Sequence, residues 1–218
     1  MPTPLLQLHN ISCTKGYERL FAGLSCALSA GELLYVTGPN GSGKTTLLRV
    51  LAGLNRDYSG TLHFKGEDVR SSWPLYAPEL LYMGHQPALK AQLTARENLL
   101  WYAHCCGATV AEVDAALNAV GLAHRADLPA HQLSAGQQRR VVLARLMFSQ
   151  QAVWILDEPF TAIDAAGFAP VFACLQVHLQ RGGLVVMTSH HGMDDIPLPH
   201  RSLCMADYDP QNYVPHNY

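Results

Sequence analysis

The nine residues 38–46, GPNGSGKTT, constrain the fold of this chain more than any other stretch. An apolar run at residues 33–37 comes directly before them, and a second apolar run at residues 47–52 follows. This order matches the phosphate-binding loop pattern G-x-x-x-x-G-K-[ST], which requires a strand before the loop and a helix after it. The pattern therefore predicts an α/β fold with a P-loop NTPase core and a nucleoside triphosphate as its ligand.

Each residue type in this loop has a physical role beside a phosphate. Glycine permits backbone conformations closed to residues with a Cβ, so that successive N–H groups converge on phosphate oxygens. The positive end of the following helix points at the same anion. Lys44 is placed to reach the β- and γ-phosphates, and the hydroxyl of Thr45 can bind Mg²⁺. The predicted nucleotide contacts come from Gly38, Pro39, Asn40, Gly41, Ser42, Gly43, Lys44, Thr45 and Thr46.

Composition limits the partners of this domain. Charged residues make up 15% of the 218 residues, against an average of about 25%, which suggests a surface that a partner covers. With a formal net charge of -2 and no long basic tract, nucleic acid is not an expected ligand. The N-terminus lacks the features of a signal peptide, and no run approaches the roughly 18 apolar residues that span a bilayer. We therefore expect a cytosolic chain that reaches a membrane only through another subunit.

The cysteines predict no chemistry of their own. They show no C-x-x-C spacing, so we expect small, buried, reduced thiols rather than disulfides. Two of them are neighbours on a predicted helix, where adjacent side chains point in different directions, and this argues against a shared metal or haem contact. The six are Cys13, Cys26, Cys105, Cys106, Cys174 and Cys204.

The pattern of elements predicts one domain over residues 1–218. Residues 1–87 and 133–206 form its nucleotide-binding α/β core. Residues 88–132 form a helical subdomain inserted into that core, because apolar residues recur there at helical spacing. Residues 207–218 are polar and are expected to form a loose tail.

Alternation of apolar and polar residues predicts a separate antiparallel β subdomain at the start of the chain. Its candidate strands are residues 5–12 and 20–28. Further strands are predicted at residues 59–66, 79–84, 152–156 and 184–188. Helices are predicted after a capping box at residues 94–97, over residues 110–120, from residue 134 onward and from residue 161 to residue 179.

A second anion site is predicted where the helix after residue 133 begins. Ser134 is predicted to be the N-cap, and Ala135, Gly136 and Gln137 follow it in the first turn. Glycine in a first helical turn lowers helix propensity by roughly 1 kcal/mol, so Gly136 is expected to serve close approach of a ligand. The N–H groups of such a helix start bind anions.

Two acidic residues end the buried strand at residues 152–156. Asp157 is placed to hold Mg²⁺, usually through water, and Glu158 to act on an attacking water as a general base. The strand at residues 184–188 leads to a histidine doublet, His190 and His191, either of which could donate a hydrogen bond to a γ-phosphate oxygen. We favour His190, the first of the two. Tyr17 and Phe21 are equal candidates for stacking on the purine ring.

Taken together, five segments resemble the ABC (ATP-binding cassette) ATPases over almost the whole chain. They are GPNGSGKTT, Gln86, the LSAGQ motif at residues 133–137, WILDEP at residues 154–159, and the turn at residues 161–164 with His190. The resemblance implies an ATP-hydrolysing enzyme with a RecA-like core.

The same resemblance assigns roles to single residues. It implies Gln86 as a sensor of Mg²⁺ and water that touches the transport partner, and residues 134–136 as the signature motif. Asp157 is then the magnesium aspartate and Glu158 the catalytic glutamate. Asp164 is the acid of the D-loop, and His190 is the switch histidine.

Partners also follow from the resemblance. In this family the signature motif contacts the nucleotide of a second cassette, which implies a homodimer around two ATP molecules. Three positions depart from the family pattern: Ala135 replaces a glycine, Ile163 a leucine, and Lys15 stands where many cassettes place the aromatic residue that stacks on adenine.

Within the family, the chain is most similar to the haem-exporter ATPases of cytochrome c maturation. Residues 133–141, 143–146 and 153–161 carry this likeness. It implies integral membrane subunits of the CcmB and CcmC kind, a link to a periplasmic haem chaperone, and the cytoplasmic face of the bacterial inner membrane. The alternatives are another ABC importer or exporter subunit and a soluble cassette of iron–sulfur cluster assembly.

Overall fold

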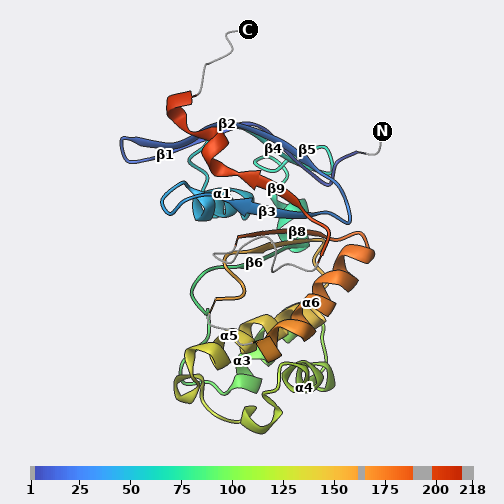
Figure 1. Cartoon of the computed structure of the whole chain (residues 1–218). Helices are drawn as coiled ribbons and strands as arrows, with labels where there is room; N and C mark the ends of the chain where they lie inside the picture. Colours follow the sequence, from blue (N-terminus) through green and yellow to red (C-terminus); the bar gives the residue numbers. More distant parts are fainter. Residues whose placement is uncertain (1–2, 162–164, 189–197, 213–218) are drawn as a thin grey trace.

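The computed structural model describes residues 3–161, 165–188 and 198–212. Figure 1 shows an antiparallel sheet at one end, a parallel sheet beneath it, and helices α3, α4 and α5 at the opposite end. Helix α1 lies between the two sheets, and helix α6 runs from the parallel sheet toward the other helices.

The parallel sheet has five strands in the order β6-β7-β8-β3-β9. Every neighbouring pair in it is parallel. The apolar runs predict four of these strands, but they miss β9, because Leu203 is the one buried residue of that short edge strand. The strands are β3 (Leu33–Thr37), β6 (Leu80–Met83), β7 (Val153–Leu156), β8 (Leu184–Thr188) and β9 (Arg201–Cys204).

Both faces of this sheet are covered, which is why its central strands are apolar throughout. Leu34 and Val36 of β3 belong to the core between the sheet, α1 and the antiparallel sheet. Leu33 and Tyr35 belong to a second core on the opposite face, together with residues of α6. Successive side chains of a strand point to opposite faces, and β7 and β8 divide their residues in the same way.

The antiparallel sheet has the order β2-β1-β4-β5. Its strands are β1 (Leu6–Lys15), β2 (Glu18–Leu28), β4 (Ser59–Phe64) and β5 (Glu67–Asp68). Leu6, Leu8, Ile11 and Cys13 of β1 face the first core, and the register shifts between Leu8 and Ile11. Asn10, with φ of 51°, lies at this irregularity. The predicted β subdomain is therefore present, with longer first strands than expected.

Six α-helices lie within the described residues. They are α1 (Lys44–Leu51), α2 (Trp73–Tyr76), α3 (Ala95–Cys106), α4 (Val110–Ala119), α5 (Ala135–Ala144) and α6 (Ala165–Gln180). Short 3₁₀ turns lie at Ala77–Glu79, Ala123–Arg125, Ala130–Gln132, Arg145–Phe148, Met205–Tyr208 and Pro210–Asn212. The short α2 has no counterpart among the predicted helices.

Helices α3 and α4 begin with capping boxes, in which Thr94 pairs with Glu97 and Thr109 with Glu112. They share a third core with α5, to which α5 contributes Val141. Another α5 residue, Leu143, belongs to the second core instead, so α5 connects the helical region to the parallel sheet. The proposed domain limits at residues 88 and 132 stay a prediction.

The cysteines are free thiols, as the sequence predicts. The prediction that they are all buried holds only for Cys13. Cys105 is exposed, and the other four, Cys26, Cys106, Cys174 and Cys204, are partly buried. Adjacent residues of a helix point in different directions, and only Cys106 faces the third core.

The predicted loose tail from residue 207 stays a prediction. Tyr208 packs against the first core, and residues 210–212 contact β2. Among the helices of the described ranges, none has the length and apolar character needed to cross a bilayer.

Candidate functional site

The loop between β3 and α1 has the backbone shape that the sequence predicts. Gly38, Gly41 and Gly43 have φ values of 140°, 85° and 91°, a region that side chains with a Cβ disfavour. A Cβ on Gly38 would lie 2.8 Å from Oγ of Ser42, and one on Gly43 would lie 2.9 Å from Cδ1 of Phe21. Both glycines are therefore required by the space around them as well as by their conformation.

Lys44 is the first residue of α1 and is 9% exposed. Its Nζ donates hydrogen bonds to the carbonyl oxygens of Gly38 at 2.7 Å and Pro39 at 3.0 Å. The ammonium group is thus held inside the curve of the loop. A cation in this position can neutralise a phosphate that the loop surrounds.

Asp157 follows β7 and is 1% exposed. Its Oδ1 accepts a hydrogen bond from Oγ1 of Thr188 at 2.8 Å. Its Oδ2 is buried and has no hydrogen-bond partner within the described part of the chain. A buried carboxylate oxygen without a partner is costly unless a donor or cation satisfies it, and Mg²⁺ prefers oxygen ligands. The donor set at this position fits a magnesium ion.

Glu158, the next residue, has φ of 50°. Its backbone N–H donates to Oγ1 of Thr188 at 2.9 Å, so one hydroxyl contacts both acidic residues. Its Oε2 lies 3.1 Å from Nδ1 of His85 and accepts a longer hydrogen bond from Thr161 at 3.4 Å. The side chain is 12% exposed, which leaves part of the carboxylate open to water.

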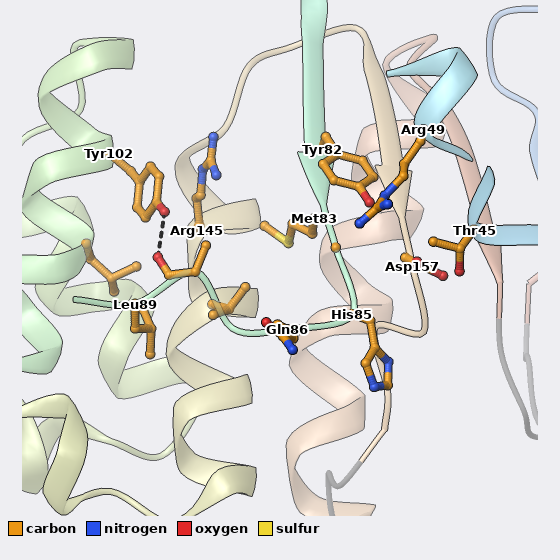
Figure 2. Close-up of a pocket in the computed structure, with 14 residues that line it drawn as sticks. Thr45, Arg49, Tyr82, Met83, His85, Gln86, Leu89, Tyr102, Arg145 and Asp157 are labelled. Carbon is orange, nitrogen blue, oxygen red and sulfur yellow. Dashed lines mark hydrogen bonds between the residues drawn. The ribbon is translucent and has the colours of Figure 1, made fainter. Parts of the chain in front are cut away.

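A cavity of about 470 Å³ brings the predicted metal ligands together. Thr45, Gln86 and Asp157 all line it, with Thr45 and Asp157 at one end in Figure 2. Its opposite side comes from the helical region, where Tyr102 donates a hydrogen bond to the carbonyl of Ala88 at 2.9 Å. The loop of Gln86 therefore runs between the P-loop and the helices.

The signature residues occupy a different place. Ser134 caps α5: its Oγ accepts from the N–H of Gln137 at 3.3 Å, and Oε1 of Gln137 accepts from the N–H of Ser134 at 3.0 Å. This confirms the predicted cap. None of residues 134–137 lines the cavity that holds Thr45 and Asp157.

The two candidates for stacking on adenine differ in exposure. Phe21 is 0% exposed and packs against the P-loop at Gly43, so its ring has no free face for a base. The candidacy of Phe21 is therefore wrong, because its apolar ring is needed in the core. Tyr17 is fully exposed at the turn between β1 and β2 and remains a candidate.

Three further predicted residues, Asp164, His190 and His191, lie outside the described residues.

Three residues of the site escape the sequence patterns. Thr188 contacts both acidic residues, His85 contacts Glu158, and the buried Arg139 contacts the backbone of both adjoining loops. A polar residue that ends the apolar run of β8 was a signal for Thr188. No sequence spacing indicates Arg139, because its partners are backbone carbonyls, which every residue carries.

Comparison with known proteins decides the family. The model of the ABC transporter family matches residues 21–161. The chain belongs to the ABC transporter family. As an ABC ATPase it has the fold class and the ATP-hydrolysing activity that the sequence predicts.

Three similar relatives of this ABC ATPase carry the same name. The "Cytochrome c biogenesis ATP-binding export protein CcmA" of Methylococcus capsulatus is 48% identical over 84% of this chain and 90% of its own length. Proteins of the same name from Pseudomonas syringae pv. tomato and Salmonella typhi are 47% and 46% identical. These two alignments cover 93% and 89% of this chain, and 96% and 91% of the relatives. The predicted likeness to the cytochrome c maturation branch is confirmed.

Solved structures agree on the fold of this ABC ATPase. A putative ABC transporter ATP-binding protein from Pyrococcus furiosus superimposes with a TM-score of 0.79 at 20% identity, over 94% of this chain and 98% of its own. An ATP-binding cassette in its ADP conformation gives a TM-score of 0.69 at 24% identity, over 87% and 82% of the two chains.

Proposed function

We propose that this chain is the ATPase subunit of a membrane ABC complex that couples ATP hydrolysis to haem export or to release of the haem chaperone in cytochrome c biogenesis. One observation carries the ATPase chemistry: Asp157, whose buried Oδ2 has no hydrogen-bond partner among the described residues, lines the same cavity as Thr45 and Gln86 and is followed by Glu158. The name that the relatives share supports the biological role.

ATP binds at the loop of residues 38–46. The backbone N–H groups of the loop and the start of α1 surround the phosphates, and Lys44 exchanges carbonyl oxygens of the loop for phosphate oxygens. Thr45, Gln86 and Asp157 hold Mg²⁺ directly or through water. When bound, the ion neutralises charge that develops on the phosphate oxygens.

Glu158 prepares the attacking water as a general base. Its partly exposed carboxylate and the fixed backbone around it suit a group that must accept a proton at a defined position. His190 then donates a hydrogen bond to the γ-phosphate, and Asp164 lies at the contact between subunits; both assignments rest on the family resemblance alone.

A second copy of the chain completes the site. Ser134, Ala135, Gly136 and Gln137 do not line the cavity of their own subunit, and a capped helix start with a glycine is suited to bind a phosphate that another subunit holds. Two chains would then enclose two ATP molecules as a homodimer.

Integral membrane subunits of the CcmB and CcmC kind bind on the helical side. The loop of Gln86 passes from the nucleotide site into a cavity that Leu89, Leu99 and Tyr102 also line, so a partner seated there contacts the same loop. In this proposal the chain works at the cytoplasmic face of the bacterial inner membrane, with an indirect link to a periplasmic haem chaperone.

The test uses the chain purified together with its membrane subunits. We expect Mg²⁺-dependent ATP hydrolysis, loss of hydrolysis in Lys44→Ala, and haem-loaded chaperone only in cells that carry the wild-type chain. A wild-type complex that neither binds nor hydrolyses ATP contradicts the proposal. Hydrolysis without any effect on haem loading contradicts only the haem role.

A further inference from the structure

Arg139 is the most fully bonded charged side chain among the buried residues of the site. It lies in α5 and is 3% exposed. Its guanidinium donates hydrogen bonds to five backbone carbonyl oxygens. Nε donates to Pro159 at 3.0 Å, and Nη1 donates to Gly84 at 3.0 Å and to His85 at 3.3 Å. Nη2 donates to Asp157 at 2.9 Å and to Glu158 at 2.5 Å.

These five carbonyls belong to two segments that leave the sheet side by side. Strands β6 and β7 are paired up to Met83 and Leu156, and the N–H of Asp157 donates to the carbonyl of Met83 at 2.8 Å. Beyond this point the guanidinium of Arg139 bridges the segments, one of which leads to Gln86 and the other through Glu158.

The chemistry of the guanidinium suits this position. Five N–H donors in a rigid planar fork can serve several carbonyls at once, whereas the ammonium of lysine offers three donors from one atom. Burial lowers the pKa of Arg139, and the nearby carboxylates of Asp157 and Glu158 oppose this shift. Arg139 therefore holds the backbone of both segments through a single planar group.

The position of Arg139 in the chain also connects these two segments to the signature residues. It lies in the second turn of the helix that Ser134 caps, and that helix packs against both the helical region and the parallel sheet. One side chain thus connects the helix of the signature residues to the segments of Gln86 and Glu158.

We propose that Arg139 is a positioning residue for ATP hydrolysis, which fixes the turn of Glu158 and the loop of Gln86 to the helix that carries the signature residues. This inference rests on the proposed function of Glu158. Arg139 makes no contact with ATP in this proposal. The rate of hydrolysis therefore depends on Arg139, whereas ATP binding by the P-loop does not.

The experiment compares Arg139→Gln and Arg139→Lys with wild type in the complex with the membrane subunits. We expect kcat to fall about tenfold or more in Arg139→Gln, because each hydrogen bond from a charged donor contributes the equivalent of about a tenfold change. Arg139→Lys should recover part of kcat, while KM and the Kd for ATP stay within about threefold of wild type. Arg96→Gln is the matched control, since this arginine pairs with Asp114 and Asp127 inside the helical region and its loss should leave kcat unchanged.

Each outcome decides the question. A wild-type kcat in Arg139→Gln overturns the inference, and so does a loss of ATP affinity in parallel with kcat, which indicates a general structural role. If Arg139→Gln is recovered only as aggregate, Arg139→Lys decides by the same two criteria. Absence of hydrolysis in the wild type contradicts the proposed function instead, so the two failures are distinguishable.

Discussion

Steric contacts restrict which residue types several positions of this chain accept, as much as hydrogen bonds do. Gly43 has φ of 91°, and a Cβ there would lie 2.9 Å from the buried ring of Phe21. His178 stacks on Trp154 with ring centroids 3.7 Å apart and planes 9° apart. Burial lowers the pKa of His178 to about 4, from an ordinary value of 6.5. Each of these arrangements leads to a prediction.

Gly43→Ala should destabilise the protein and weaken ATP binding. The added methyl group meets Phe21, and the left-handed backbone is strained for alanine, so we expect a loss of roughly 2 kcal/mol in the free energy of unfolding. Urea denaturation and equilibrium ATP binding measure the two effects. Gly66→Ala is the control, because Gly66 has φ of 88° with open space around it and carries only the strain. Equal losses in both variants would show that contact with Phe21 is unimportant.

His178→Phe should change how stability depends on pH. The folded protein keeps His178 neutral down to about pH 4, whereas the unfolded chain takes up a proton below about pH 6.5. Because the unfolded state binds more protons in that window, His178 lowers wild-type stability as the pH falls from 6.5 to 4. Relative to His178→Phe, the wild type should lose roughly 1 to 2 kcal/mol over this range, after allowance for partial exposure. Parallel denaturation curves at pH 7 and pH 4.5 measure this difference, and no change in it contradicts the prediction.

At the scale of elements, helices α3, α4 and α5 each begin with a capping box. Thr94, Thr109 and Ser134 each cap a helix whose third residue returns a hydrogen bond to the cap. The first two caps serve the helical region alone. The cap at Ser134 also begins the signature segment. Of these three caps, only the one of α5 is therefore proposed to have a role in nucleotide binding as well as in helix stability.

Ser134→Ala and Thr109→Ala separate these two uses. Each substitution removes one N-cap, and we expect each to lower the free energy of unfolding by about 1 kcal/mol. Only Ser134→Ala should also reduce ATP hydrolysis, because only that cap is proposed to meet the nucleotide of a second subunit. Thermal unfolding and steady-state ATPase rates measure the two effects. Full turnover in Ser134→Ala would remove Ser134 from the proposed site.

At the scale of the whole molecule, the signature residues lie apart from the cavity of the predicted metal ligands. Thr45, Asp157 and Gln86 line one cavity, but the signature residues at the start of α5 lie elsewhere. The proposed homodimer supplies them from a second copy, and loss of the γ-phosphate removes the charge that two positive helix starts share.

Glu158→Gln should retain ATP binding and accumulate as a closed dimer. The amide cannot accept the proton of the attacking water, so the bound ATP persists between the subunits. Sedimentation velocity with Mg²⁺ and ATP should then show a dimer, and the double variant Lys44→Ala/Glu158→Gln should remain monomeric. A single variant that hydrolyses ATP at the wild-type rate excludes Glu158 from the mechanism.

The sequence alone determined the local features of this protein. Glycine spacing in the P-loop, the caps at Thr94 and Ser134, and the apolar runs of the central strands each depend on neighbouring residues, and all appear in the structure as predicted. Strand β9 escaped prediction because an edge strand with a single buried residue has little pattern. The candidacy of Phe21 failed because its burial depends on how β2 packs against the P-loop.

Only the tertiary structure decided which distant residues share the site. Thr188 bridges Asp157 and Glu158 because β7 and β8 are parallel neighbours. Arg139 joins two loops because α5 packs beneath the ends of β6 and β7. Its partners are main-chain carbonyl oxygens, which are the same at every position of the chain. No pattern of side chains can specify such contacts, and they arise only when packing brings the segments together.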